Sequence, residues 1–129
     1  MSFHFCIIKK LKTRFTLKNI KPILIVPGEP NSIFFEIFFK SIKLKKYRSP
    51  LIIICSKKLL INQMKKFKFK REIKLIKPTN EALKNIKNNT LNLIDVELNF
   101  NPSLKKISID SNSYIKKCFD IAFGIIKTG

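Results

Sequence analysis

The sequence has no tryptophan, three glycines, and a single histidine, His4. A phosphate-binding loop of the GxGxxG or Walker type needs several glycines close together, and Gly28 is the only interior glycine before Gly124. One imidazole cannot hold a metal ion alone, and His4 would have to fold back from the terminus to serve as a catalytic base. Glycine-loop nucleotide sites and histidine-dependent nucleophilic catalysis are therefore not expected.

The three cysteines, Cys6, Cys55 and Cys118, are far apart and show no CxxC spacing. This pattern disfavours a disulfide framework or a zinc site, and each cysteine is expected to be a small buried apolar side chain. No apolar run approaches the roughly 20 residues that cross a bilayer. The apolar stretch Phe3 to Ile8 precedes the first basic residues, which is the reverse of the order in a signal peptide. We expect a cytoplasmic protein without a membrane segment.

Acidic residues are also scarce, with Asp+Glu 8 against Lys+Arg 27 and a formal net charge of +19 over 129 residues. The chain is rich in Lys, Ile, Asn and Phe, whose codons are rich in A and T, so nucleotide composition alone raises the charge. The hydrophobic fraction of 45% is enough for a core, and the charge is spread along the chain. One globular domain is the expectation.

Residues 1–21 contain no acid and mix lysines with Phe, Ile and Leu. We interpret them as a basic N-terminal extension that forms either an extra strand or a poorly ordered segment. The absence of acidic residues is typical of an organellar presequence, but such presequences are rich in Arg and Ser and this segment is not. Residues 22–129 then form the main α/β portion.

Short apolar runs alternate with stretches of helical period from Pro22 onward, which predicts an α/β fold. Residues 51–55 are apolar without alternation, as in a parallel strand buried on both faces. Residues 79–90 fit either a short helix or a loop. Strands are predicted at 23–26, 51–55, 72–76 and 91–96, and helices after Ser32, from Ser56 to about 67, and after 108–112 with Gly129 at the C-cap.

The turn Pro27 to Asn31 is the best local candidate for a binding site. It joins a strand to a helix N-terminus, where free backbone N–H groups and the positive end of the helix dipole attract an anionic group of a ligand. A plain connecting turn is the alternative. Paired carboxylates are a second possibility, and the acidic candidates are Glu29, Glu36, Asp95, Glu97, Asp110 and Asp120.

The run Lys65 to Arg71 interleaves cations with Phe67 and Phe69, as single-strand nucleic-acid binders do. The alternative is a solvated helix end followed by a strand edge, with both aromatic rings turned inward. We favour this alternative because no nucleic-acid module signature is present.

The turn and its surroundings resemble the N-terminal part of 4-hydroxythreonine-4-phosphate dehydrogenases, whose first strand enters a loop of the pattern GEPAGIGPE. The corresponding residues here run from Gly28 to Glu36, with Phe and Ser in place of the later glycines and proline. Residues 50–60 resemble the family's second strand and following helix. Leu93-Ile94-Asp95-Val96 and residues 108–122 resemble its "IDV" strand and the "SAENG" entry to a long helix.

The resemblance implies a partial, truncated, Rossmann-like three-layer fold similar to isocitrate and isopropylmalate dehydrogenases. The family enzyme is an oxidoreductase of vitamin B6 (pyridoxine 5'-phosphate) biosynthesis that acts as a homodimer. It uses NAD or NADP and a divalent metal held by three histidines. Its catalytic and metal-binding residues lie beyond the stretch matched here, so none is carried over. Gly28, Glu29 and Pro30 are the cofactor- or substrate-binding candidates.

The resemblance therefore predicts an N-terminal fragment of such a dehydrogenase, inactive alone, with the remainder supplied by a second chain. A small basic protein that binds RNA or an anionic surface through its charge is the alternative. A remnant without function is the third possibility.

Overall fold

A computed structural model describes residues 7–10, 21–30, 32–79, 82–84, 86–98 and 109–128. Within them the chain forms one mixed sheet with the strand order β1-β2-β3-β5-β4. Four strands are parallel: β2 (Ile23–Val26), β3 (Leu51–Cys55), β5 (Leu91–Asp95) and β4 (Ile73–Leu75). The chain is therefore an α/β protein, as the alternation of apolar runs and helical stretches predicts.

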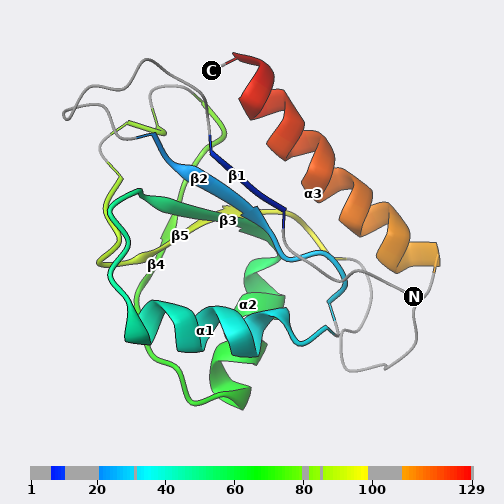
Figure 1. Cartoon of the computed structure of the whole chain (residues 1–129). Coiled ribbons are helices and arrows are strands. Elements are labelled where there is room, and N and C mark those ends of the chain that lie inside the picture. The colour runs from blue at the N-terminus through cyan, green and yellow to red at the C-terminus, as the bar shows by residue number, and fades with distance from the viewer. Residues whose placement is uncertain are drawn as a thin grey trace.

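The helices cover both faces of the sheet, so that the molecule has three layers (Figure 1). Helix α1 (Phe34–Leu44) and helix α2 (Lys57–Lys66) lie on one face. Helix α3 (Ile109–Thr128) runs across the other face and packs on β2 and β3. None of the helices in the described part of the chain is long and apolar enough to cross a membrane.

Burial explains why the central strands carry no polar alternation. Ile52, Ile53 and Ile54 of β3 are successive residues, yet all three are inaccessible to solvent because helices cover both sides of the sheet. The side chains with 1% exposure or less are mainly aliphatic and come from the three central strands and the inner faces of α1 and α2. They are Leu24, Val26, Phe35, Ile52, Ile53, Ile54, Cys55, Leu59, Leu60, Leu93 and Asn92.

The four phenylalanines of α1 make this helix apolar on more than one side, and all four are buried. Phe39 stacks on Phe69, with ring centroids 4.5 Å apart, and also meets Phe67 edge-on. The segment after α2 therefore closes over α1. The outer side of α1 stays in solvent, where Ile33 is 64% and Ile37 is 54% exposed.

The ends of two predicted elements differ from the prediction. The side chain of Ser32 accepts a hydrogen bond from the N–H of Phe34 at 3.3 Å, but α1 begins one residue later than a Ser32 cap implies, with Ile33 at the N-cap. Alternation in residues 72–76 suggests that Ile73 and Leu75 face the core, yet Leu75 is 54% exposed. The sheet ends at β4, so no layer covers this residue.

The N-terminal segment contributes one strand, β1 (Ile7–Lys10), which pairs antiparallel with β2. Of the two interpretations offered for residues 1–21, the extra strand holds for these four residues. His4, Cys6 and the proposed C-cap Gly129 lie outside the described residues. The described parts of residues 79–90 form turns rather than a helix.

Candidate functional site

The turn after β2 is the first candidate site, and its backbone requires the residues found there. Gly28 has φ 82, in the left-handed region that favours glycine. The N–H of Ser32 donates to the carbonyl of Glu29 at 3.1 Å and closes a four-residue turn. Pro30 occupies the second position, where its fixed φ fits. The rings of Pro27 and Pro30 are fully buried, so the turn is anchored on both sides of the glycine.

The same edge of the sheet gathers the carboxyl ends of the parallel strands, where α/β proteins bind ligands. Ser56 follows β3 and caps α2, accepting a hydrogen bond from the N–H of Leu59 at 3.3 Å. Asp95 ends β5, and its carboxylate accepts from the N–H of Lys57 at 2.8 Å. This carboxylate therefore sits at the N-terminus of α2, where the helix dipole stabilises negative charge.

A buried polar contact fastens α3 to this edge. The hydroxyl of Tyr114 accepts a hydrogen bond from the N–H of Ser56 at 2.7 Å and also bonds to Cys118, one turn along α3. Burial raises the pKa of the Tyr114 hydroxyl and of the Cys55 thiol well above their ordinary values. Burial likewise raises the pKa of Cys118 to about 12, partly offset by its bond to Tyr114. All three groups stay protonated at neutral pH, so Cys55 and Cys118 are inert apolar side chains, as predicted.

Two of the acidic candidates form ion pairs within their own helices. Glu36 pairs with Lys40 at 2.9 Å, and Asp120 pairs with Lys116 at 3.5 Å, each one turn away on its own helix. Glu97 is exposed, and the side chain of Asp110 lies outside the described part of the structure. Among the described residues, no three His, Cys, Asp or Glu side chains converge where they could hold a metal ion. These residues therefore do not form a metal site.

The basic run Lys65 to Arg71 adopts the arrangement favoured from its sequence. Phe69 is buried against Phe39, and Phe67 is half-buried, so neither ring is presented as a flat platform for a base. Arg71 lies over the ring of Phe69, at 5.4 Å from its centroid. The cations around these rings therefore cover apolar surface.

No protein-family model and no curated protein matches the chain. Its assignment therefore depends on the residues themselves and on their arrangement.

The opposite, amino edge of the sheet contains a feature that the sequence analysis missed. Asn88 joins the loop before β3 to the loop before β5. Its amide donates to the carbonyls of Tyr47 at 3.0 Å and Ser49 at 2.8 Å, and its side-chain oxygen accepts from the N–H of Leu51 at 2.8 Å. Asn88 thus uses both ends of its amide to fix the two loops relative to each other.

Asn92 acts in the same way from within β5. It is 1% exposed, and its amide donates to the carbonyls of Leu51 at 3.0 Å and Lys87 at 2.9 Å. Its side-chain oxygen accepts from the hydroxyl of Thr90 at 3.0 Å. All hydrogen-bonding positions of the primary amide except one lone pair are occupied. The side chains of two asparagines therefore fix the loops at the amino edge.

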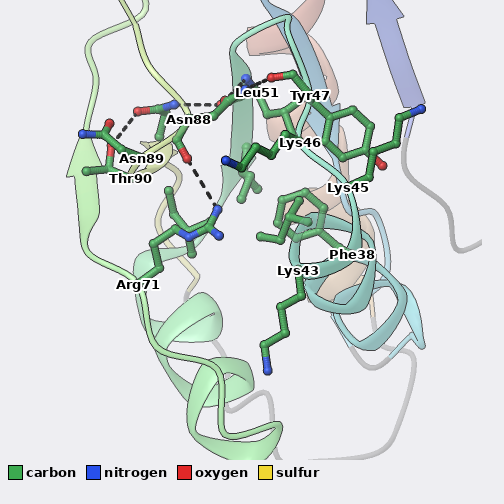
Figure 2. A pocket seen from close by; sticks show the side chains of 14 residues that line it. Phe38, Lys43, Lys45, Lys46, Tyr47, Leu51, Arg71, Asn88, Asn89 and Thr90 are labelled. Atoms are coloured by element: carbon green, nitrogen blue, oxygen red, sulfur yellow. Dashed lines mark hydrogen bonds between the residues drawn. The ribbon is translucent and has the colours of Figure 1, made fainter.

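These two loops, the end of α1 and the start of β4 enclose a pocket of about 550 Å³ (Figure 2). Its wall contains four cations and no acid, while its floor is apolar. The lining residues are Phe38, Ile42, Lys43, Lys45, Lys46, Tyr47, Leu51, Ile53, Arg71, Asn88, Asn89, Thr90, Leu91 and Asn92. The only signal of this pocket in the sequence is a pair of asparagines four residues apart. Asn88 precedes the strand predicted at 91–96, and Asn92 lies within it.

Proposed function

We propose that the chain is the N-terminal α/β portion of an NAD(P)-dependent dehydrogenase similar to the 4-hydroxythreonine-4-phosphate dehydrogenases. The observation that most directly supports this proposal is the turn from Gly28 to Pro30. The residues that match the family's GEP pattern form a tight turn at the carboxyl end of a central parallel strand, directly before a helix. Parallel α/β sheets bind ligands at this edge, which supports the assignment.

Each residue of the turn has a distinct physical role in this proposal. Gly28 supplies a backbone conformation that other residues adopt at a cost of about 1 kcal/mol or more, and Pro30 fixes the exit of the turn. Both hold the half-buried Glu29 at the edge where a substrate or cofactor would lie. Ser56 and Asp95 end the neighbouring strands at the same edge. The chain would thus supply one wall of a binding cleft and orient what lies against it.

We assign no metal-dependent step to this chain, because no three His, Cys, Asp or Glu side chains of the described residues lie close enough together to hold a metal ion. In the family, a nicotinamide cofactor accepts a hydride from the substrate alcohol, assisted by a divalent metal. The residues for that chemistry have no counterpart among those matched here. Those residues would lie outside the residues matched here, and catalysis would depend on this portion together with the part that carries them.

Mixing experiments test this proposal. The purified chain is assayed with 4-phosphooxy-L-threonine, a divalent metal and NAD or NADP, alone and together with the C-terminal portion of a family member. We expect no reduction of the nicotinamide by the chain alone and measurable reduction by the pair. Turnover by the chain alone would contradict the proposal. So would a pair that associates in gel filtration but stays inactive.

A charge-matched pair of variants locates the effect. Glu29→Gln lies in the turn, whereas Glu72→Gln removes the same charge at an exposed position before β4. We expect the first to lower the rate of the assembled pair at least tenfold and the second to leave it within twofold. Equal effects of the two substitutions would show that the turn has no special role.

A further inference from the structure

We propose that the pocket at the amino edge of the sheet binds a small phosphate ester that has an aromatic or apolar body. This inference goes beyond the proposed dehydrogenase function and does not depend on it, because the pocket and the Gly28–Pro30 turn lie at opposite edges of the sheet. The volume of about 550 Å³ falls within the range of small-molecule sites and accommodates a ligand of mononucleotide size.

Two of the four pocket cations, Lys43 and Lys45, are held by contacts within the protein. Lys43 lies in the last turn of α1 and Lys45 is its C-cap, where the helix dipole stabilises positive charge, and the two lie over the rings of Phe69 and Tyr47 respectively. Figure 2 shows both side chains directed away from the centre of the pocket. Helix capping and ring contacts account for them, so they are not needed as ligand-binding groups.

Lys46 and Arg71 line the same pocket, and in the view of Figure 2 their charged ends point toward the region of Asn88. Arg71 also lies over the Phe69 ring, but unlike Lys43 and Lys45 it is not directed away from the pocket. Arg71 is half-buried, and one of its N–H groups makes a long contact of 3.5 Å with the carbonyl of Asn88. Lys46 has no hydrogen bond or ion pair to any described residue. Two cations facing one space without an acid repel each other, and an anion between them would relieve that repulsion.

The excess of cations in the chain does not account for this arrangement. Cations without acidic partners are common on the surface, since 27 basic residues face 8 acids. Fully solvated lysines repel each other weakly, however, because water and salt screen their charges. Arg71 is instead held by a backbone carbonyl and by the ring of Phe69 over an apolar floor, where screening is weaker.

The floor determines which anion fits. Ile42 and Leu51 are half-buried, and with the edges of the largely buried Phe38 and Leu91 they form an apolar surface beneath the cations. Inorganic phosphate would satisfy the charges and leave this surface in water. An uncharged aromatic molecule would cover the floor and leave the cations unpaired. A phosphate ester with an aromatic body satisfies both, and a guanidinium beside an ammonium is a suitable phosphate receptor.

Calorimetric titration of the full chain tests the proposal. The probes are AMP and 4-nitrophenyl phosphate, with adenosine and inorganic phosphate as the two half-ligands. We expect saturable binding of at least one ester, at least tenfold tighter than binding of either half-ligand, and weakening as salt is raised. Absence of saturable binding by both esters would overturn the proposal. Equal affinity for inorganic phosphate would also overturn it, because the apolar floor would then contribute nothing.

Three charge-neutralising variants separate the pocket from the general charge. Lys46→Gln and Arg71→Gln act inside the pocket, and Lys58→Gln removes one charge from the exposed start of α2, at the opposite edge of the sheet. We expect each pocket variant to weaken ester binding about tenfold and Lys58→Gln to change it less than twofold. Equal weakening by all three would overturn the proposal and indicate nonspecific attraction.

Two further measurements keep the test decisive. Arg71→Lys retains the charge and loses the fork of donors, so its binding should lie between that of wild type and Arg71→Gln, while circular dichroism checks that each variant is folded. Single-stranded RNA is titrated in parallel. The contrary outcome is RNA binding that is tighter than ester binding, with an affinity that Lys46→Gln and Arg71→Gln leave unchanged. That result would show that the positive charge of the chain serves nucleic-acid binding, and it would overturn the proposed small-ligand site.

Discussion

The two edges of the parallel sheet are held together by different means. At the carboxyl edge, Asp95 and Ser56 bond to backbone N–H groups at the start of α2, and Tyr114 binds the same segment from α3. At the amino edge, Asn88 and Asn92 tie loops together through backbone carbonyls, and two cations face a common space. At the carboxyl edge the Asp95 carboxylate accepts a backbone N–H, whereas at the amino edge the side chain of Lys46 has no hydrogen bond or ion pair among the described residues.

At the amino edge, the residues that fix the loops are therefore not the residues that carry the positive charge. The asparagines are neutral and nearly saturated with hydrogen bonds, so they hold the amino-edge loops without neutralising Lys46 or Arg71. At the carboxyl edge, one residue both carries the charge and fixes the backbone, because the carboxylate of Asp95 accepts the hydrogen bond from the N–H of Lys57. Substitutions at the two edges should therefore differ in what they change.

The largest effect is expected from Asn92→Leu. The substitution keeps the number and branching of the side-chain heavy atoms but leaves the carbonyls of Leu51 and Lys87 without their donor, and we expect a loss of about 3 kcal/mol in the free energy of unfolding. Urea denaturation followed by circular dichroism measures it. Asn89→Leu is the control, because Asn89 is exposed and should cost less than about 0.5 kcal/mol. Similar losses for both would show that the Asn92 hydrogen bonds are not what holds the amino edge.

High pH should destabilise the protein through the buried thiol beside Tyr114. The pKa of Cys118 is raised to about 12 in the folded chain, so its stabilising contribution is complete below the ordinary thiol pKa and is lost as pH rises from there toward about 12. The loss between pH 9 and 11 should be about 2 kcal/mol. Urea midpoints across this range measure it, and Cys118→Ala should show a shallower fall. Parallel curves for the two proteins would contradict the prediction.

A smaller effect is expected from Tyr114→Phe, which breaks the polar contact between α3 and the carboxyl edge. The N–H of Ser56 loses its buried acceptor, and we expect a loss of about 1.5 kcal/mol. Thermal unfolding measures it. Tyr47→Phe is the matched control, because Tyr47 participates here through its backbone carbonyl, which the substitution retains. If Tyr114→Phe left the stability unchanged, the prediction would be wrong, and water would then replace the hydroxyl as acceptor without cost.

The smallest effect is expected from Ser56→Ala at the start of α2. Loss of the N-cap oxygen should cost about 1 kcal/mol, and Ser56→Asp should recover most of it. Denaturant midpoints of the two variants measure this. Neither substitution should alter ester binding at the amino edge, which is the sharpest check that the two edges act independently.

The sequence predicted most of the elements because their signals are local. Ser56 is followed by an amphipathic stretch, and the structure has it as the cap of α2. The unbroken apolar run at residues 51–55 predicted a strand buried on both faces, and this is confirmed. The helical spacing of seven apolar residues predicted α3, and the structure confirms the helix. Four of the seven are buried and three are half-buried: Tyr114, Cys118, Ala122 and Ile125, and Ile115, Phe119 and Ile126.

Features that depend on neighbours could not be predicted in the same way. Leu75 alternates like a core residue, yet it is exposed because β4 is the edge strand and no layer covers it. β5 lies between β3 and β4 although it follows both in the chain, and no local pattern specifies that order. The pocket escaped prediction because its lining comes from four separate segments.

The amino-acid sequence by itself determined the α/β class, the tight turn at Gly28, the helix cap at Ser56 and the inert buried cysteines. Each of these follows from hydrophobic period or from the backbone preference of a few adjacent residues. Only the tertiary structure decided which cations face one another. Lys46 and Arg71 are 25 positions apart, and strand order together with the Asn88 and Asn92 hydrogen bonds brings their charges to one side of the sheet.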